Sequence, residues 1–188
     1  VTGVGFQPDF LWVKDRINGG HSHRLADIVR GATKQLNSDT TLAEATDSTV
    51  FSAFDSDGFS IGTNGSVNTN TNTYVAWNWK AGGTAVSNTD GTITSSVSAN
   101  TTAGFSIVSY TGNGTSGATF GHGLSQAPEL VIIKNRESTS GTSASAGWVV
   151  YSDPVGNTKY LYLNESKAEA IDSGRFNATT PSASVVTL

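Results

Sequence analysis

The sequence has no cysteine, no methionine and few charged residues, and these shortages exclude several classes of protein. Without cysteine, no disulfide can stabilise the chain in any compartment. Charged residues make up only 14% of the chain and the net charge is −4, with no basic stripe of the kind that binds nucleic acid. Apolar runs such as Phe10 to Val13 fall far short of the roughly 20 residues that span a membrane. We therefore expect neither nucleic-acid binding nor membrane insertion.

What the chain does contain is glycine, serine, threonine and asparagine in abundance, a composition that can indicate disorder. Against disorder stand 4 Trp, 5 Tyr and 8 Phe, which lie in short apolar runs and can build cores. Short strands joined by turn-rich loops fit both observations. Because the chain opens at Val1 and lacks methionine, we expect it to be an internal segment of a longer protein.

An internal repeat organises the sequence. Pro8 to Arg16 recurs as Pro128 to Arg136, at an offset of 120, with Pro, Lys and Arg identical. Further along, the offset becomes 125, and the change falls in loop-like stretches that tolerate insertions. The matches at this second offset are Gly31 to Leu36 with Gly156 to Leu161, Ala43 to Ala45 with Ala168 to Ala170, Asp47 with Asp172, and Phe51 with Phe176.

These patterns predict an all-β fold made of two related repeats, each resembling a β-sandwich or jelly roll, with short helical excursions. The first repeat would span residues 1–83 and the second residues 104–188. Residues 84–103 would form a linker, part of which could pair as a strand through Ile93 and Val97.

Individual strands are predicted from aromatic and β-branched enrichment and from alternation. Tyr74 to Trp79 and Tyr160 to Leu163 alternate as half-buried strands do. The runs FLWVK and LVIIK are continuously apolar, as is typical of strands buried on both faces. Asp57-Gly58 and Asn64-Gly65 are among the pairs that predict turns. Residues 40–46, which contain LAEA, predict a short helical or loop excursion.

Each repeat lacks one element that the other has. The first has no counterpart of Phe105 to Tyr110, and the second has none of Tyr74 to Trp79. Either the chain belongs to a longer repeat array or neighbouring subunits supply the missing strands, and both alternatives predict an assembly. An incomplete sheet exposes unpaired N–H and C=O groups, so we expect the isolated chain to be oligomeric or prone to aggregate.

Several motifs carry a family resemblance over nearly the whole chain. They are GFQPDFLWVKDR, RGATK, FDSDGF, YVAWNWKAGG, IVSYTGNGT, GHGL and APELVIIKNR. With these motifs the sequence resembles uncharacterised repeat modules in tail-fibre-like proteins of marine bacteriophages. The resemblance implies a virion appendage at the virion surface or outside the cell, often beside lectin-like domains. It implies homo-oligomers or neighbouring virion proteins as partners, and no active site.

Three groups of residues are candidates for metal or catalytic sites. Asp55-Ser56-Asp57-Gly58 could begin a calcium loop, but a tight turn between two phenylalanines is the simpler interpretation. His21 and His23 could form a zinc pair, yet no third ligand follows, and His122 is interpreted as a turn or packing residue. Asp9 and Glu129 could be paired glycosidase carboxylates, but they occupy equivalent repeat positions. No G-x-S-x-G nucleophile elbow is present. We therefore predict no enzymatic activity, no metal and no cofactor.

Aromatic side chains are the remaining candidates for a binding site, because an aromatic face packs against a sugar ring. Core and subunit-interface packing is the alternative role for the same residues. The sequence thus predicts a structural and adhesive component of a virion appendage that presents polar loops, such as the one between Glu137 and Gly147. A carbohydrate-binding, lectin-like adhesin for a host surface glycan is the alternative, and a glycan depolymerase a lesser one. The candidate aromatics are Tyr74, Trp77, Trp79, Trp148, Tyr160 and Tyr162.

Overall fold

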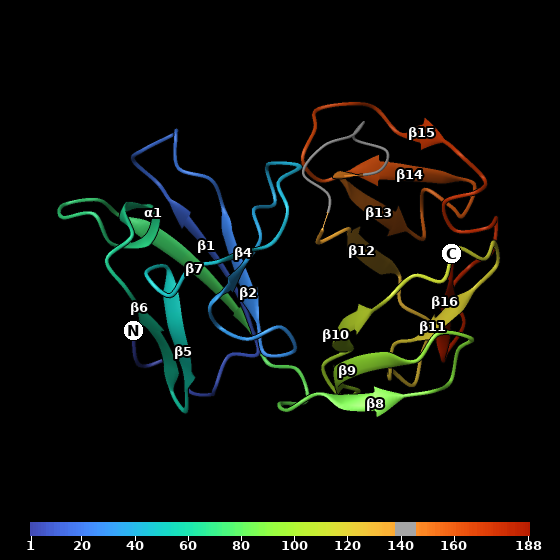
Figure 1. Cartoon of the computed structure of the whole chain (residues 1–188), viewed down its shortest axis with the longest axis horizontal. Coiled ribbons are helices and arrows are strands. Elements are labelled where there is room, and N and C mark those ends of the chain that lie inside the picture. The colour runs from blue at the N-terminus through green and yellow to red at the C-terminus, as the bar shows by residue number, and fades with distance from the viewer. Residues whose placement is uncertain (138–145) are drawn as a thin grey trace.

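The computed structural model describes residues 1–137 and 146–188, and within them the regular secondary structure consists almost entirely of short strands joined by loops (Figure 1). The predicted all-β class is confirmed. No helix in the described part is long and apolar enough to cross a membrane. The elements are β1 (Phe10–Asp15), β2 (Arg24–Asp27), β3 (Lys34–Gln35), β4 (Ala45–Thr46), β5 (Phe51–Asp55), β6 (Gly58–Ile61), α1 (Gly65–Asn68), β7 (Tyr74–Trp79), β8 (Val86–Asn88), β9 (Ser95–Asn100), β10 (Phe105–Tyr110), β11 (Thr119–Gly121), β12 (Leu130–Lys134), β13 (Trp148–Ser152), β14 (Lys159–Tyr162), β15 (Ala170–Ile171) and β16 (Val185–Thr187).

The N-terminal half, residues 1–83, is built around the antiparallel sheet β2-β1-β7. Alternation along β1 places Leu11 and Val13 in a buried core, while Phe10 and Trp12 point to the opposite face. The hairpin β5–β6 contributes Phe51 and other apolar side chains to the same core. The sheet therefore has one buried face and one apolar outer face.

The C-terminal half, residues 84–188, contains the sheets β10-β9-β8 and β12-β13-β14-β15 and the pair β11–β16. Its core gathers side chains from several of these strands, with Phe120, Tyr151 and Phe176 among the buried ones. The segment predicted as a linker supplies β8 and β9 to this half. Val97 pairs with Val108 of β10, and Ile93 is buried in the core, so the predicted strand within the segment is confirmed.

Two sets of strand pairs have matching registers. In β1–β2, Phe10 pairs with Asp27 and Trp12 with Leu25; in β12–β13, Leu130 pairs with Ser152 and Ile132 with Val150. These partners differ by the sequence offsets of 120 and 125. The β3–β4 and β14–β15 pairs agree likewise: Lys34 and Gln35 pair with Thr46 and Ala45, and Lys159 and Tyr160 pair with Ile171 and Ala170.

The two halves meet through the outer face of the β2-β1-β7 sheet. Trp148 of β13 is buried against Leu25 and Leu36, and its Nε1 donates to the carbonyl of Asn37 at 2.8 Å. Phe105 of β10 lies against Phe10, with the ring centroids 6.1 Å apart. Figure 1 shows this arrangement, with the N-terminal half on the left and the C-terminal half on the right.

Residues 40–46, for which a short helix was one prediction, form no helix, and tertiary contacts fix their conformation. Residues 41–44 have no regular secondary structure and lead into β4, whereas the short helix of the described chain lies at Gly65–Asn68. The backbone N–H of Glu44 donates to the carbonyl of Arg136, and its carboxylate lies 3.0 Å from Arg30. These long-range contacts hold the segment in a non-helical conformation despite its helix-forming residues, so of the two alternatives the loop is correct.

Two further local predictions are wrong. Leu130 and Ile132 of β12 are 58% and 40% exposed, so the LVIIK run is not buried on both faces. The pair Asn64-Gly65 begins a helix rather than a turn, because the Asn64 side chain caps α1 by accepting from the backbone N–H of Ser66. The predicted loop between Glu137 and Gly147 falls mostly outside the described residues.

Phe51 and Phe176 provide a test of the two cores, since each is buried almost completely in a different half. Replacing either with alanine should lower the free energy of unfolding by about 3–5 kcal/mol, from lost burial and the cavity left behind. Leu42→Ala, at a position 52% exposed, is the control and should change it by less than about 0.5 kcal/mol. Denaturant unfolding measures all three; a loss near 1 kcal/mol for either phenylalanine would contradict the assignment.

Candidate binding site

Three tryptophans line an open pocket of about 190 Å³ on the outer face of the β2-β1-β7 sheet. Trp12 comes from β1, and Trp77 and Trp79 come from β7. Antiparallel pairing sets Trp12 opposite Trp77, with the ring centroids 6.1 Å apart and the planes at 71°. The sheet register therefore builds the pocket, because Trp77 and Trp79 are two residues apart and point to the same face.

Two of the three indoles have further partners, and the third is the most exposed. Trp12 Nε1 donates to His23 Nδ1 at 2.8 Å, and Trp79 packs edge-on against Phe10 and stacks with Phe105. Trp77, which contacts Trp12, is 43% exposed. The pocket is thus an aromatic surface open to solvent, suited to a ligand with a flat or C–H-rich face.

The structure separates the six candidate aromatics. Trp77 and Trp79 lie in the pocket. Tyr74 is a structural residue, because its hydroxyl donates to the carbonyl of Gly65 and accepts from the backbone N–H of Thr69.

The other three candidates lie in the C-terminal half. Trp148 is buried between the halves, and Tyr160 is buried in the C-terminal core beneath the guanidinium of Arg175. The hydroxyl of Tyr162 bonds that of Tyr160, and this bond, ahead of burial, raises the pKa of Tyr162 to about 12.

Trp12 completes the pocket, although sequence reasoning did not select it. The run FLWVK was interpreted as continuously apolar, which hides which face each residue takes. The alternation within it was the available signal, since Phe10, Trp12 and Lys14 share one face of the strand. That this face meets Trp77 could not be predicted from the alternation alone, because the β1–β7 register depends on the fold.

The acidic motif at Asp55 to Gly58 forms the turn of the β5–β6 hairpin. Asp57 accepts the backbone N–H groups of Gly3 and Gly5, at 3.0 and 2.6 Å, and Asp55 accepts the Ser60 hydroxyl. Both carboxylates thus serve the local fold. In the described part of the chain, no three His, Cys, Asp or Glu side chains cluster as metal ligands would.

Buried Asp9 and Asp15 lie near opposite ends of the β1–β7 pair. Asp9 Oδ2 accepts the backbone N–H groups of Ala81 and Gly83, while Glu129, its sequence equivalent, is exposed. Asp15 accepts from Asn72 and from two backbone N–H groups, and lies 2.9 Å from His21 Nδ1. Burial is the largest influence on the pKa of Asp15 and raises it. The hydrogen bonds together outweigh burial and hold that pKa well below its ordinary value.

His21 and His23 serve different neighbours, so the two imidazoles considered as a zinc pair are engaged separately. Nδ1 of His23 accepts from Trp12, whose indole N–H can only donate, and this fixes a neutral tautomer. In His122, Nδ1 accepts the backbone N–H of Leu124 and Nε2 lies 3.2 Å from the carbonyl of Ser182. Burial lowers the pKa of both His23 and His122. His122 is thus a packing residue, as expected.

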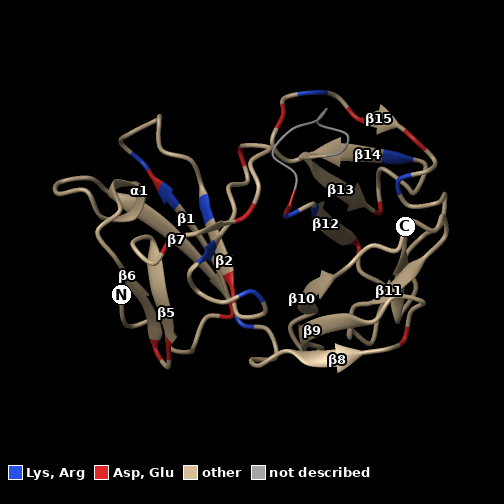
Figure 2. Cartoon of the chain, viewed as in Figure 1, with Lys and Arg blue, Asp and Glu red and all other residues tan. Residues whose placement is uncertain are grey.

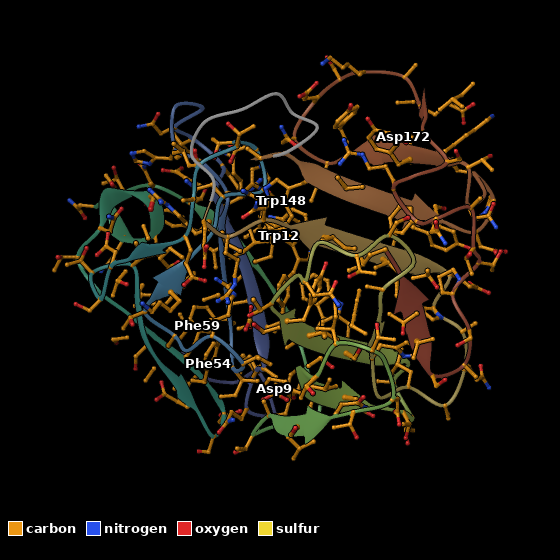
Figure 3. The ribbon with its side chains drawn as sticks, turned by 45° about the vertical axis from the view of Figure 1, so that its right-hand side comes forward. Asp9, Trp12, Phe54, Phe59, Trp148 and Asp172 are labelled. Carbon is orange, nitrogen blue, oxygen red and sulfur yellow. The ribbon has the colours of Figure 1, made fainter. Side chains whose placement is uncertain are left out.

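Charged side chains of one sign do not gather into a second candidate site on the described surface. Figure 2 shows Lys and Arg mixed with Asp and Glu over both halves. Figure 3 shows Trp12 and Trp148 between the two halves, with Asp9 below them. The tryptophan pocket is the candidate binding site because it presents exposed aromatic faces.

Comparison with known proteins gives a family. The family model described as a domain of unknown function, DUF7483, matches residues 1–188. The chain belongs to this family. No curated protein and no solved structure matches it. The DUF7483 domain brings no assigned chemistry, so the function has to be argued from the structure itself.

Half-buried His23 and buried His122 predict a pH-dependent stability. Because folding lowers their pKa below the ordinary 6.5, the unfolded chain binds more protons as the pH falls past that value. The stability they contribute is present above pH 6.5 and is lost as the pH falls through the lowered values of the folded state.

We expect the unfolding free energy to decrease from pH 7.5 to pH 5, and to decrease less in His23→Gln, which keeps an acceptor for the indole of Trp12. Denaturant titrations at each pH measure this. An unchanged pH dependence in His23→Gln and His122→Gln would contradict the assigned tautomers.

Proposed function

We propose that this DUF7483 domain is a non-enzymatic structural and adhesive module of a virion appendage, exposed on the particle surface. Its scaffold consists of two related units, residues 1–83 and 104–188, with residues 84–103 between them. The observation that carries the proposal is the agreement of strand registers in β1–β4 and β12–β15. Repeated units along one chain build an extended scaffold that presents a surface for binding, as an adhesive module requires.

Hydrogen bonds outside the strand ladders support the same relation. The N–H of Gly31 donates to the carbonyl of Asp27, as that of Gly156 does to Ser152. The N–H of Asp47 donates to Thr33, and that of Asp172 donates to Thr158. Each pair of bonds differs by the same 125 residues, so turns as well as strands agree. Such agreement in backbone detail favours a common origin over chance resemblance.

The carboxylates considered for glycosidic chemistry favour a structural role. A general acid and a nucleophile must both face a substrate. Asp9 is buried and bonded to two backbone N–H groups, and Glu129 is exposed on the other half. Asp55 and Asp57 organise a hairpin turn.

A carbohydrate-binding role is the second candidate, and the tryptophan pocket favours it. Indole faces pack against the C–H groups of pyranose rings, and an exposed face such as that of Trp77 is the part a sugar would reach. In this form the module would hold a host surface glycan, while the rest of the chain acts as scaffold.

The structural proposal predicts that the chain is a component of virus particles. Mass spectrometry of purified particles of the virus that encodes it should find its peptides, in a constant ratio to capsid protein through successive purification steps. Peptides present in the infected lysate but lost from purified particles would contradict a virion role.

The glycan candidate predicts that Trp77→Ala weakens binding on a glycan array at least about tenfold, because the substitution removes a stacking face. Leu42→Ala removes a comparably exposed apolar side chain elsewhere and should bind as the unaltered chain does. If the unaltered chain binds no glycan, the module is structural alone; equal binding by both variants would place the glycan outside the pocket.

A further inference from the structure

Strand β12 has a free edge. On β1, one edge pairs with β2 and the other with β7, whereas β12 pairs with β13 alone among the described strands. The N–H of Asp153 donates to the carbonyl of Glu129. Since bonded pairs alternate along an antiparallel ladder, Val131 and Ile133 bond to β13. The backbone groups of Leu130 and Ile132 therefore point toward the free edge.

The side chains at this edge are apolar and exposed. Leu130 is 58% and Ile132 is 40% exposed. At the matching positions of β1, Phe10 lies 5.3 Å from Trp79 and Trp12 lies 6.1 Å from Trp77, measured between ring centroids. Among the described strands, none gives Leu130 and Ile132 the cross-strand partners that β7 gives to β1.

A carboxylate stands beside the same edge. Asp9 fixes the segment after β7 by accepting the N–H groups of Ala81 and Gly83 at 2.8 and 3.1 Å. The residue 120 positions later is Glu129, which is exposed. It can accept the equivalent N–H groups of an incoming strand.

Three other edge strands in the described structure, β7, β8 and β15, offer less to an incoming strand than β12 does. Strands β8 and β15 have only three and two residues, and at the outer edge of β7 the side chain of Asn78 donates to the carbonyl of Ala76. Short strands and occupied backbone groups discourage pairing. Lys134, the one charge in β12, donates to the carbonyls of Thr41 and Asn135. Because its ammonium group is engaged in these bonds, Lys134 is not placed to repel a strand that pairs with the edge.

We propose that the β12 edge binds one strand of the β7 kind, supplied by another chain of the same family. This strand is extended and antiparallel to β12, carries aromatic residues at alternate positions, and is followed by small residues whose N–H groups reach Glu129. The choice of occupant rests on the proposed relation between the two units, because β7 occupies the matching edge of β1. The resulting contact extends a sheet across two molecules.

A labelled peptide with the sequence of residues 73–83, TYVAWNWKAGG, tests the proposal by fluorescence anisotropy against the full chain. The N–H of Arg16 donates to the carbonyl of Thr73, so the alternation directs the N–H of Trp77 toward β1 and that of Ala76 away. N-methylation at Trp77 of the peptide should weaken binding about tenfold, and N-methylation at Ala76 should not.

Variants of the chain complete the test. Ile132→Pro removes an N–H from the free edge without breaking a bond to β13, and should weaken peptide binding about tenfold. Glu129→Gln should weaken it less, and Leu42→Ala should leave it unchanged. Unfolding midpoints near that of the unaltered chain establish that the variants are folded.

Three outcomes would overturn the proposal: no binding of the peptide to the folded chain, equal binding of the two methylated peptides, or undiminished binding to a folded Ile132→Pro. None of them bears on the presence of the chain in virus particles or on glycan binding. Failure of this inference can therefore be told apart from failure of the proposed function.

Discussion

The apolar outer face of the β2-β1-β7 sheet is the constraint on which the rest of the structure depends. Because the hairpin β5–β6 covers only the inner face, the aromatic side chains of the outer face need another cover. Trp148 provides it beside β2, and Phe105 provides it where Phe10 and Trp79 meet. The part left uncovered is the tryptophan pocket. The contact between the halves and the candidate binding site thus arise from one apolar surface.

Buried carboxylates give this surface its fixed geometry in a chain without disulfides. An unpaired buried charge is costly, so Asp9 and Asp15 are stable only with their donors in place. The donors of Asp9 and one donor of Asp15 belong to the segments on either side of β7: Ala81 follows the strand, and Asn72 precedes it. A slip of β7 along β1 would take these donors away from both carboxylates. The same bonds therefore secure the register that sets Trp77 opposite Trp12.

Sequence patterns predicted those features that depend on neighbouring residues. Alternation gave Tyr74–Trp79 the bounds that the structure has, because one face of that strand packs against the core. The conformation of the segment before β4 could not be predicted from its own residues, because Glu44 bonds Arg136, which lies 92 residues away. The pocket could not be predicted for a similar reason. Trp77 and Trp79 were among six candidates, but their meeting with Trp12 depends on the pairing of β1 with β7.

The two sets of four strands, β1 to β4 and β12 to β15, lie in different surroundings. This difference explains where the candidate binding surfaces lie. Strands β1 to β4 share their half with β5, β6 and β7, whereas β12 to β15 share theirs with β8 to β11 and β16. Phe51 is buried in the first setting and Phe176 in the second. The outer edges differ, because β7 pairs with β1, whereas β12 pairs with β13 alone among the described strands. The aromatic pocket forms where that strand is present, and the open apolar edge of β12 where no such strand lies in the described chain.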